Sequence, residues 1–306
     1  MKKVIITGAT GSIGMALINK LLNENISILI ITRKDSKRNK NIPKNKLIKI
    51  IYSDLEHLCE IENIDNDEYD TFYHFAWSGT TGKDRNNMYM QNNNIKYTLD
   101  AVKLASKFKC KMFIGAGSQA EYGLASEPLN ANTKTNPFTG YGMAKLCAGL
   151  MSRKLAHDLG MKHIWTRILS VYGPYDSECS LIMTILNNAH NDMDINLTKG
   201  EQVWDFIYSE DVSQIMFLLS QKGIDGKTYI VGSGKTKTIK EYIEIILKYI
   251  ETKSNVNFGT IPYSENQIMY LCADNKELLE DISYTIKNDF NNGIKKLIDW
   301  YRKNHL

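Results

Sequence analysis

The chain has 306 residues, of which 43% are apolar and 24% charged, and its formal net charge is +4. This length suffices for one large domain or for two medium domains that share a core. The composition is that of a folded globular protein and excludes a disordered chain. The net charge is too small and too dispersed to indicate a nucleic-acid partner.

The cysteines and the apolar runs bear on the compartment. The five cysteines are widely spread and form no Cys-x-x-Cys pair, so we expect neither a disulfide framework nor a zinc site, and a reducing compartment fits better. The first apolar run, Val4–Ile6, is too short for a signal peptide, and we find no run of the roughly 20 apolar residues that a membrane span needs. We therefore predict a cytoplasmic protein with no membrane partner and no metal.

Short β-branched runs alternate with longer amphipathic stretches in the first half of the chain. Near-continuous apolar strands of this kind are typical of a parallel sheet that is covered on both faces. The alternation predicts an α/β Rossmann fold with a doubly wound parallel sheet. The expected strands are Val4–Thr7, Ser27–Thr32, Leu47–Tyr52, Thr71–Ala76, Lys111–Gly115 and His163–Ser170, and the expected helices are Ser12–Leu22, Asn86–Phe108 and Thr139–Leu159.

The pattern changes after Pro174. We expect a smaller, interleaved C-terminal substrate domain made of residues 174–204 and 236–306, and a dinucleotide-binding domain made of residues 1–173 and 205–235. Ser209 is interpreted as a capping serine, and the Lys- and Asn-rich segment Lys34–Lys46 as a solvated loop. The expected elements are helices at Leu181–Ala189, Ser209–Ser220, Thr238–Ile250 and Asn291–Arg302, and one strand at Thr228–Val231, with the segment Asp205–Tyr208 left unassigned.

A glycine-rich loop joins the first predicted strand to the first predicted helix. Glycines with the spacing GxxGxxG can make a tight turn, let backbone approach a pyrophosphate and allow close helix packing. The helix N-terminus adds free N–H groups and a positive dipole end. In this context the loop predicts dinucleotide binding. Its expected cofactor-binding residues are Gly8, Thr10, Gly11, Ser12, Ile13 and Gly14.

The end of the second strand bears on which nicotinamide cofactor is used. NAD enzymes tend to carry an acid there for the ribose 2′-hydroxyl, whereas NADP enzymes use a basic residue for the 2′-phosphate. The sequence places Arg33 at this point, and the nearest acid, Asp35, comes slightly late. An arginine fork suits a phosphate. We predict NADP, with NAD as the alternative.

Tyr141 and Lys145 form a YxxxK pair on a predicted helix. At this spacing the two side chains share one helix face, and an ammonium near a phenol lowers its pKa from about 10 toward a working range. The spacing alone proves little, because Tyr249 and Lys253 repeat it. Ser118 follows the fifth strand, where a cofactor-facing crevice is expected.

Together these residues resemble the extended branch of the short-chain dehydrogenase/reductase superfamily, the NAD(P)-dependent nucleotide-sugar epimerase/dehydratase family. The resemblance covers almost the whole chain, and it is the joint match that is specific. The matching segments are the glycine loop, Asp54-Leu55, His74-Phe75-Ala76, Asn94 with Thr98, Ser118 to Gly123, Tyr141 with Lys145, Arg167 to Pro174, Asp205 to Tyr208, and Asp211-Val212.

The resemblance implies roles for these residues. Ser118 would polarise the sugar oxygen, Tyr141 would transfer the proton, and Lys145 would lower the tyrosine pKa and bind the nicotinamide ribose. Asp54 and Leu55 would contact adenine, and Ala76 would lie along the cofactor. The helices at 86–108 and 139–159 resemble the pair that forms a homodimer interface in this family. Contacts with a nucleotide-sugar substrate are expected from Trp77, Ser118, Gln119, Arg167, Lys199 and Trp204.

Two arginines that usually touch the nucleotide diphosphate in the family are missing here. Trp204 stands at one position, and Pro262 to Asn266 occupies the region of the other. We expect either that Lys199 or Arg167 compensates or that the nucleotide of the substrate differs. The acids that dehydratases place after the catalytic hydroxyl residue are also missing, because Gln119 and Ala120 stand there. Glu121 is one residue late, and on extended backbone a one-residue slip turns a side chain to the opposite face.

Three functions remain in competition. The leading one is an NAD(P)-dependent reductase of a nucleotide-linked 4-keto-deoxy sugar, because such a reaction needs only Ser118, Tyr141, Lys145 and a hydride. A nucleotide-sugar 4-epimerase on the same scaffold is the alternative, since the same three residues suffice for it. A non-catalytic dinucleotide-binding regulator would be expected to lack Tyr141 or Lys145, and both are present.

Overall fold

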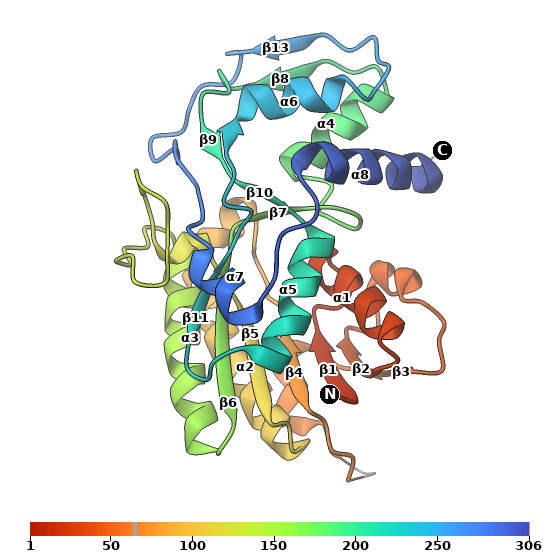
Figure 1. Ribbon diagram of the computed structural model, residues 1–306, viewed down its shortest axis with the longest axis vertical. Coiled ribbons are helices and arrows are strands. Elements are labelled where there is room, and N and C mark those ends of the chain that lie inside the picture. Colours follow the sequence, from red (N-terminus) through yellow and green to blue (C-terminus); the bar gives the residue numbers. More distant parts are fainter. Residues whose placement is uncertain (64–65, 306) are drawn as a thin grey trace.

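A seven-stranded parallel sheet forms the larger part of the molecule (Figure 1). The computed structural model describes residues 1–63 and 66–305. The strand order is β11-β6-β5-β4-β1-β2-β3, so the order reverses between β1 and β4, where a doubly wound sheet opens a ligand crevice at its carboxyl edge. The strands are β1 Lys3–Thr7, β2 Ser27–Thr32, β3 Ile48–Tyr52, β4 Thr71–His74, β5 Met112–Ser118, β6 Lys162–Ile168 and β11 Thr228–Val231.

Helices cover both faces of this sheet. Alternate side chains of β1 and β2 enter two different apolar clusters, one for each face, as the two-residue period of a strand requires. One face packs against α1 (Ser12–Asn23), α5 (Ser209–Lys222) and α7 (Lys276–Ile282). The other face packs against α2 (Met88–Lys107) and α3 (Gly140–Asp158). The doubly wound Rossmann architecture is therefore confirmed.

The smaller part lies at the carboxyl edge of the sheet and has its own apolar core (Figure 1). Three short pairings support it, β7 with β10, β9 with β12 and β8 with β13. Its elements are α4 Leu181–His190, α6 Ile239–Leu247, α8 Phe290–His305, β7 Ser170–Tyr172, β8 Ile195–Leu197, β9 Val203–Trp204, β10 Phe206–Tyr208, β12 Lys237–Thr238 and β13 Val256–Phe258. Within residues 1–63 and 66–305, four 3-10 helices complete the fold, η1 Lys37–Asn41, η2 Leu55–Glu60, η3 Gly82–Asn86 and η4 Gln119–Glu121.

Some details differ from the sequence-based expectation. The α5 helix begins at Ser209, but Tyr208 is its N-cap and no side chain caps it. Residues 170–172 form the separate strand β7, paired with β10, instead of extending β6. Leu278 and Ile282 of α7 pack in the core beneath the sheet, although the sequence assigned residues 236–306 to the substrate domain.

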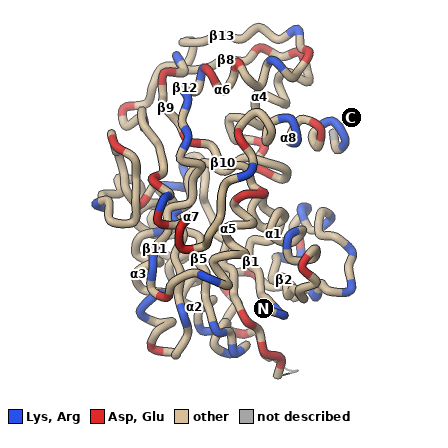
Figure 2. The backbone as a smooth tube through the Cα atoms, viewed as in Figure 1, with Lys and Arg blue, Asp and Glu red and all other residues tan. Residues whose placement is uncertain are grey.

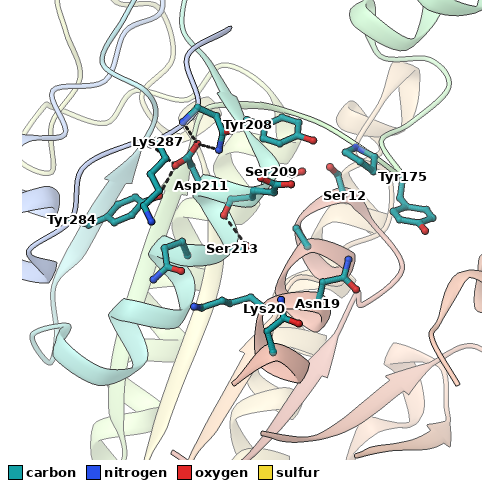
Figure 3. Close-up of a pocket in the computed structure, with 16 residues that line it drawn as sticks. Ser12, Asn19, Lys20, Tyr175, Tyr208, Ser209, Asp211, Ser213, Tyr284 and Lys287 are labelled. Carbon is teal, nitrogen blue, oxygen red and sulfur yellow. Dashed lines mark hydrogen bonds between the residues drawn. The ribbon is translucent and has the colours of Figure 1, made fainter. Parts of the chain in front are cut away.

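Asp211 ties the C-terminal segment to the sheet part of the molecule (Figure 3). Its carboxylate is 1% exposed and accepts hydrogen bonds from the Tyr284 hydroxyl, the Lys287 and Asn288 backbone N–H groups and the Asn288 side-chain amide. A buried carboxylate with this many donors, in the first turn of α5, is a strong local anchor. The anchor places the start of α8 beside α5.

Three properties of the described residues bear on possible partners: the distribution of charge, the length of apolar helices and the grouping of metal-binding side chains. Lys and Arg are interspersed with Asp and Glu over most of the chain, whereas residues 34–49 carry mainly Lys and Arg (Figure 2). Among residues 1–63 and 66–305, no helix is long and apolar enough to cross a membrane. In the same described part of the chain, no three His, Cys, Asp or Glu side chains come together as metal ligands would.

Candidate active site

The glycine loop between β1 and α1 is shaped for close contact with a ligand. Gly8 has φ +70°, and a Cβ there would lie 2.5 Å from the backbone nitrogen of Ala76. A Cβ at Gly14 would lie 2.6 Å from the Gly8 and Ala9 carbonyl oxygens, so glycine lets α1 pack directly on the loop. A Cβ at Gly11 would meet only the Gly8 carbonyl, at 3.8 Å. The loop therefore leaves open space at Gly11, as a pyrophosphate-binding turn requires.

A cavity of about 680 Å³ runs from this loop along the carboxyl edge of β1, β2 and β4. Most of the predicted cofactor-binding residues meet in its wall. Ser12 lies instead in the wall of a smaller hollow between α1 and α5 (Figure 3), and Ile13 and Gly14 lie in the first turn of α1. The wall residues that the sequence predicted are Gly8, Thr10, Gly11, Arg33, Asp54, Leu55, Ala76 and Trp77.

A second arginine joins Arg33 at the far end of this cavity. Arg38, in η1, also lines it, and its guanidinium donates to the carbonyl oxygens of Tyr175 at 2.6 Å and Asp176 at 3.0 Å. Arg38 is exposed, as the expectation of a solvated loop for most of residues 34–46 allows, but these two carbonyls fix its guanidinium. Its partners lie 137 and 138 positions away, which is why local composition gave no signal for this contact.

Ser118, Tyr141 and Lys145 come together from two elements. Ser118 ends β5 and caps η4, where its hydroxyl accepts from the Ala120 N–H at 3.2 Å. Tyr141 and Lys145 lie on the first turns of α3. Ser118 lies close enough to Tyr141 to lower the pKa of the phenol, and the Lys145 ammonium lies 5.8 Å from the centre of the Tyr141 ring. The structure therefore assembles the three residues predicted to be catalytic.

Burial sets the protonation of this group. Burial raises the pKa of Tyr141, whereas Ser118 and the charge of Arg85 lower it. Burial also lowers the pKa of Lys145 to about 7, because an ammonium in an apolar site loses its hydration. The Lys145 ammonium donates to the Ala116 carbonyl at 2.6 Å and lies 3.7 Å from the centre of the Trp77 ring.

A second cavity, of about 830 Å³, lies in the smaller part of the molecule, and residues 80, 81 and 85 contribute to its wall. Trp204 lines it and donates to the Ser170 hydroxyl at 2.7 Å. Arg85, which the sequence analysis did not single out, lines it as well. Lys199 is exposed in the loop after β8 and does not form part of this wall.

Tyr141 lines neither cavity itself, but it contacts one wall residue of each. Its ring meets Trp77, from the wall of the first cavity, edge-on at 6.1 Å. On the other side the guanidinium of Arg85, from the wall of the second cavity, lies 4.4 Å from the ring centre. A phenol in this position can exchange a proton with a substrate in one cavity while a cofactor occupies the other.

Arg167 does not face either cavity. Its Nε donates to the Glu121 carboxylate at 2.6 Å, and Glu121 is 0% exposed. The other oxygen of Glu121 accepts from the Ser118 N–H and from the Trp165 indole, both at 2.9 Å. Glu121 is thus buried beneath Ser118, and Arg167 neutralises it. Gln119 is half-buried, and its side-chain carbonyl has no hydrogen-bond partner among residues 1–63 and 66–305.

Comparison with known proteins identifies the family. The model of the NAD dependent epimerase/dehydratase family matches residues 4–232. This chain belongs to that family. It is therefore an NAD-dependent enzyme of the nucleotide-sugar epimerase and dehydratase type, as the sequence resemblance predicted.

Individual relatives are distant but cover the whole chain. CDP-abequose synthase of Salmonella muenchen is 26% identical, and the match covers 97% of both chains. A putative UDP-glucose 4-epimerase of Methanocaldococcus jannaschii is 23% identical over 99% of both. The crystal structure of UDP-glucose 4-epimerase with UDP-glucose, from Thermotoga maritima, superposes with a TM-score of 0.90 at 18% identity, covering 99% of this chain and 100% of that one.

Proposed function

We propose that this protein reduces the C4 ketone of a nucleotide-linked 4-keto-deoxy sugar. A bound nicotinamide supplies the hydride in this reaction. The observation that carries the proposal is that Tyr141 contacts a wall residue of each of two cavities, Trp77 beside the glycine loop and Arg85 in the cavity that Trp204 also lines. The first has the residues for a dinucleotide, and the second has room for a nucleotide sugar.

Each residue of the catalytic group has one task in this reaction. Ser118 donates a hydrogen bond to the ketone oxygen and polarises it. Tyr141 gives its proton to the same oxygen as the carbon is reduced. Lys145, which lies within one helical turn of Tyr141, holds the ribose of the cofactor, and its charge favours the phenolate that Tyr141 becomes.

A dehydratase activity is not proposed, because no acid stands where one is needed. Gln119 and Ala120 follow Ser118, and the carboxylate of Glu121 is occupied by Arg167, Trp165 and the Ser118 N–H. A carboxylate held by three donors in this way is a poor proton acceptor.

The cofactor is proposed to be NADP. Arg33 and Arg38 both line the cavity near the end of β2, where a 2′-phosphate would lie. Tighter binding of NADPH than NADH is expected, and Arg33→Ala should remove that preference. A tenfold preference corresponds to about 1.4 kcal/mol, which one charge-assisted phosphate contact can supply. Fluorescence titration with both cofactors tests this, and tighter NADH binding that Arg33→Ala leaves unaltered would refute it.

A nucleotide-sugar 4-epimerase remains the second candidate. Ser118, Tyr141 and Lys145 are sufficient for it, and the named relatives include a putative 4-epimerase. The two reactions differ in what happens to the cofactor. A 4-epimerase takes a hydride and returns it to the other face within one turnover, so it consumes no cofactor, whereas a reductase oxidises one NADPH for each product.

We also propose that Trp204 contacts the nucleotide of the substrate. It lines the second cavity, and an indole can stack on a base. Gln119 is proposed to accept a hydrogen bond from the sugar. Roles for Arg167 and Lys199 in holding the diphosphate are not retained, because Arg167 is engaged with Glu121 and Lys199 lies outside the cavity wall.

One experiment separates the two reactions. Purified protein is given NADPH and a panel of nucleotide-linked 4-keto-6-deoxyhexoses, and NADPH loss is compared with alcohol formed. The reductase predicts a one-to-one stoichiometry for at least one member of the panel. Protein that purifies with bound NAD and interconverts two 4-hydroxy sugars, with no net cofactor consumption, would establish the epimerase instead.

A further inference from the structure

Residues 78–87, here called the 78–87 loop, are fixed over the start of α3 by buried side chains of α2. Asn94 accepts from the Ser78 N–H and donates to the Ser78 carbonyl, both at 2.9 Å. Gln91 donates to the carbonyls of Gly79 at 2.8 Å and Asp84 at 2.9 Å. Both side chains are 1% exposed. The hydrogen bonds of two buried side-chain amides thus fix the backbone of this loop in one position.

The far end of the loop is attached to the helix that carries Tyr141. The Asn86 side chain accepts from the Gly140 N–H at 3.0 Å, one residue before Tyr141. Within the loop, the Arg85 guanidinium donates to the Thr80 carbonyl at 3.1 Å. These contacts leave the guanidinium over the face of Tyr141, 4.4 Å from the ring centre. The position of Arg85 is therefore built by the fold.

Arg85 lies closer to the Tyr141 ring than Lys145 does. The Lys145 ammonium is 5.8 Å from the ring centre and is engaged by the Ala116 carbonyl and the Trp77 ring. Burial lowers the pKa of Lys145 to about 7, so near neutral pH its charge is only partly present. A guanidinium, in contrast, stays charged in proteins.

The other charges around Tyr141 do not replace Arg85. Glu121, from η4, raises the pKa of Tyr141, whereas the Arg85 charge and Ser118 lower it. Glu121 is itself paired with Arg167. Lys145 stands on the same helix, with its charge directed at the Trp77 face. Arg85 is the cation that lies directly over the phenol.

We propose that Arg85 is a further catalytic residue, which stabilises the phenolate of Tyr141 during proton transfer. This inference rests on the proposed role of Tyr141 as proton donor. In the reduction, the hydride forms the new C–H bond, the Tyr141 proton moves to the ketone oxygen, and the phenolate left behind lies under the guanidinium. Water reprotonates the phenolate before the next turnover.

The test measures Tyr141 itself, without any substrate. Protein labelled with ¹³C at the ζ carbon of tyrosine is titrated by NMR from about pH 8 to about pH 13, a range that extends well above the ordinary tyrosine pKa because burial raises the pKa of Tyr141, and the Tyr141 signal is identified by its loss in Tyr141→Phe. In Arg85→Met the titration of Tyr141 is expected to move to higher pH by about one pH unit or more, because an opposite charge at this distance has that effect. Arg85→Lys should restore part of the difference.

A matched control comes from the same loop. Lys83 is an exposed cation in η3, so Lys83→Met should leave the Tyr141 titration unchanged. Circular dichroism and cofactor binding confirm that each variant is folded. If Tyr141 titrates in Arg85→Met as it does in wild type, the proposal is overturned.

Turnover separates this inference from the proposed function. With an accepted sugar, Arg85→Met is expected to lower kcat about tenfold. An increase in KM alone, with the titration unchanged, would make Arg85 a substrate contact and overturn the phenolate role. If the titration moves as expected but no member of the 4-keto sugar panel is reduced, the role of Arg85 is supported and the proposed reductase function fails.

Discussion

Tyr141 and Tyr249 both precede a lysine by four residues, yet only Tyr141 lies in an environment that can use the pair. Tyr141 meets a serine, a buried lysine and an arginine. Tyr249 hydrogen-bonds to the Asn291 side chain at 3.3 Å, in the smaller part of the molecule. The four-residue spacing places a tyrosine and a lysine on one helix face. The pair can serve in proton transfer only where that face lies beside the ligand crevice of the sheet.

We therefore expect Tyr141→Phe to lower turnover by a factor on the order of 100 or more, because the ring stays and the transferable proton is lost. Cofactor binding should persist. Tyr249→Phe is the matched control, with near-normal turnover. Steady-state kinetics of both variants, with cofactor binding followed by fluorescence, check the assignment. Near-normal turnover of Tyr141→Phe would refute it.

The buried Lys145 predicts a pH dependence of stability. Its folded pKa is lowered to about 7 by burial, whereas an unfolded lysine titrates near 10.4, at about the reference value. Between these values the unfolded chain binds more protons, so the free energy of unfolding contributed by Lys145 rises as pH increases, by up to about 1.4 kcal/mol per pH unit. Below about pH 7 the cost of burying the charge is fully present.

Lys145→Met removes the cost of burying the Lys145 ammonium. The difference in unfolding free energy between Lys145→Met and wild type should thus favour the variant most at or below about pH 7, and it should shrink as the pH rises toward about 10. Urea denaturation at several pH values measures this difference. A difference that is constant with pH would show that Lys145 keeps an ordinary titration in the folded chain.

Residue-level prediction succeeded where backbone geometry dictates the position. Gly8 and Gly11 of the loop, with Asp54, Leu55 and Ala76 that the family resemblance implied, line one cavity at the ends of parallel strands, and their contact with a cofactor stays a prediction. It failed where the direction of a long side chain depends on distant partners. Arg167 turns to Glu121, and Arg85 reaches Tyr141 from a loop without periodic pattern. No local signal distinguishes such an arginine from a solvated one.

Helices and strands also divide into those that the sequence predicts and those that it misses. Long helices and apolar strands were predicted to within a few residues, because their periodic burial is written in the sequence. The strands β9 and β12 have two residues each, which is too short for any alternation to be recognised. The α7 helix was missed as well, and its packing beneath β11 depends on a tertiary contact that the local sequence does not encode.

The hydrogen bonds between Asp211 of α5 and the C-terminal segment predict how substitutions in the first turn of α5 change the free energy of unfolding. Asp211 and Glu210 are neighbours in the first turn of α5, but Asp211 is buried with four donors and Glu210 pairs with Lys296 on the surface. Asp211→Ala leaves those donors unpaired, so we expect a loss of about 2–4 kcal/mol in the free energy of unfolding.

Glu210→Ala is the control for this change. An exposed ion pair contributes about 0–1 kcal/mol, so its loss should be small. Urea denaturation of the two variants and wild type gives both values. Equal effects of the two substitutions would mean that the C-terminal segment is not held through Asp211.

At the scale of the whole molecule, an apolar surface remains open on α2 and α3. The two helices pack against each other beside the sheet. On α3, Met143, Leu150 and Met151 are 48%, 58% and 46% exposed, and at the start of α2, Met88 and Tyr89 are 56% and 87% exposed. Positions 143, 150 and 151 are spaced so that they lie on one side of the helix.

We propose that this surface joins two copies of the chain in a homodimer. Exposed apolar patches of this kind usually mark an interface, and a two-fold pairing of α2 and α3 would cover the patch with its own equivalent. A stable dimer would need to bury roughly 1,200 Å² or more of total surface, which two helices from each copy can supply. Light scattering coupled to gel filtration should then give twice the chain mass.

Leu150→Arg places a charge in the middle of the proposed interface. In a two-fold dimer each copy contributes residue 150 to the interface, so the substitution buries two unpaired charges. We therefore expect the variant to elute as a monomer. Leu124→Arg is the matched control, since Leu124 is 57% exposed but lies outside α2 and α3, and it should leave the mass unchanged. A wild-type monomer, or a Leu150→Arg protein that stays dimeric, would show that α2 and α3 do not form the interface.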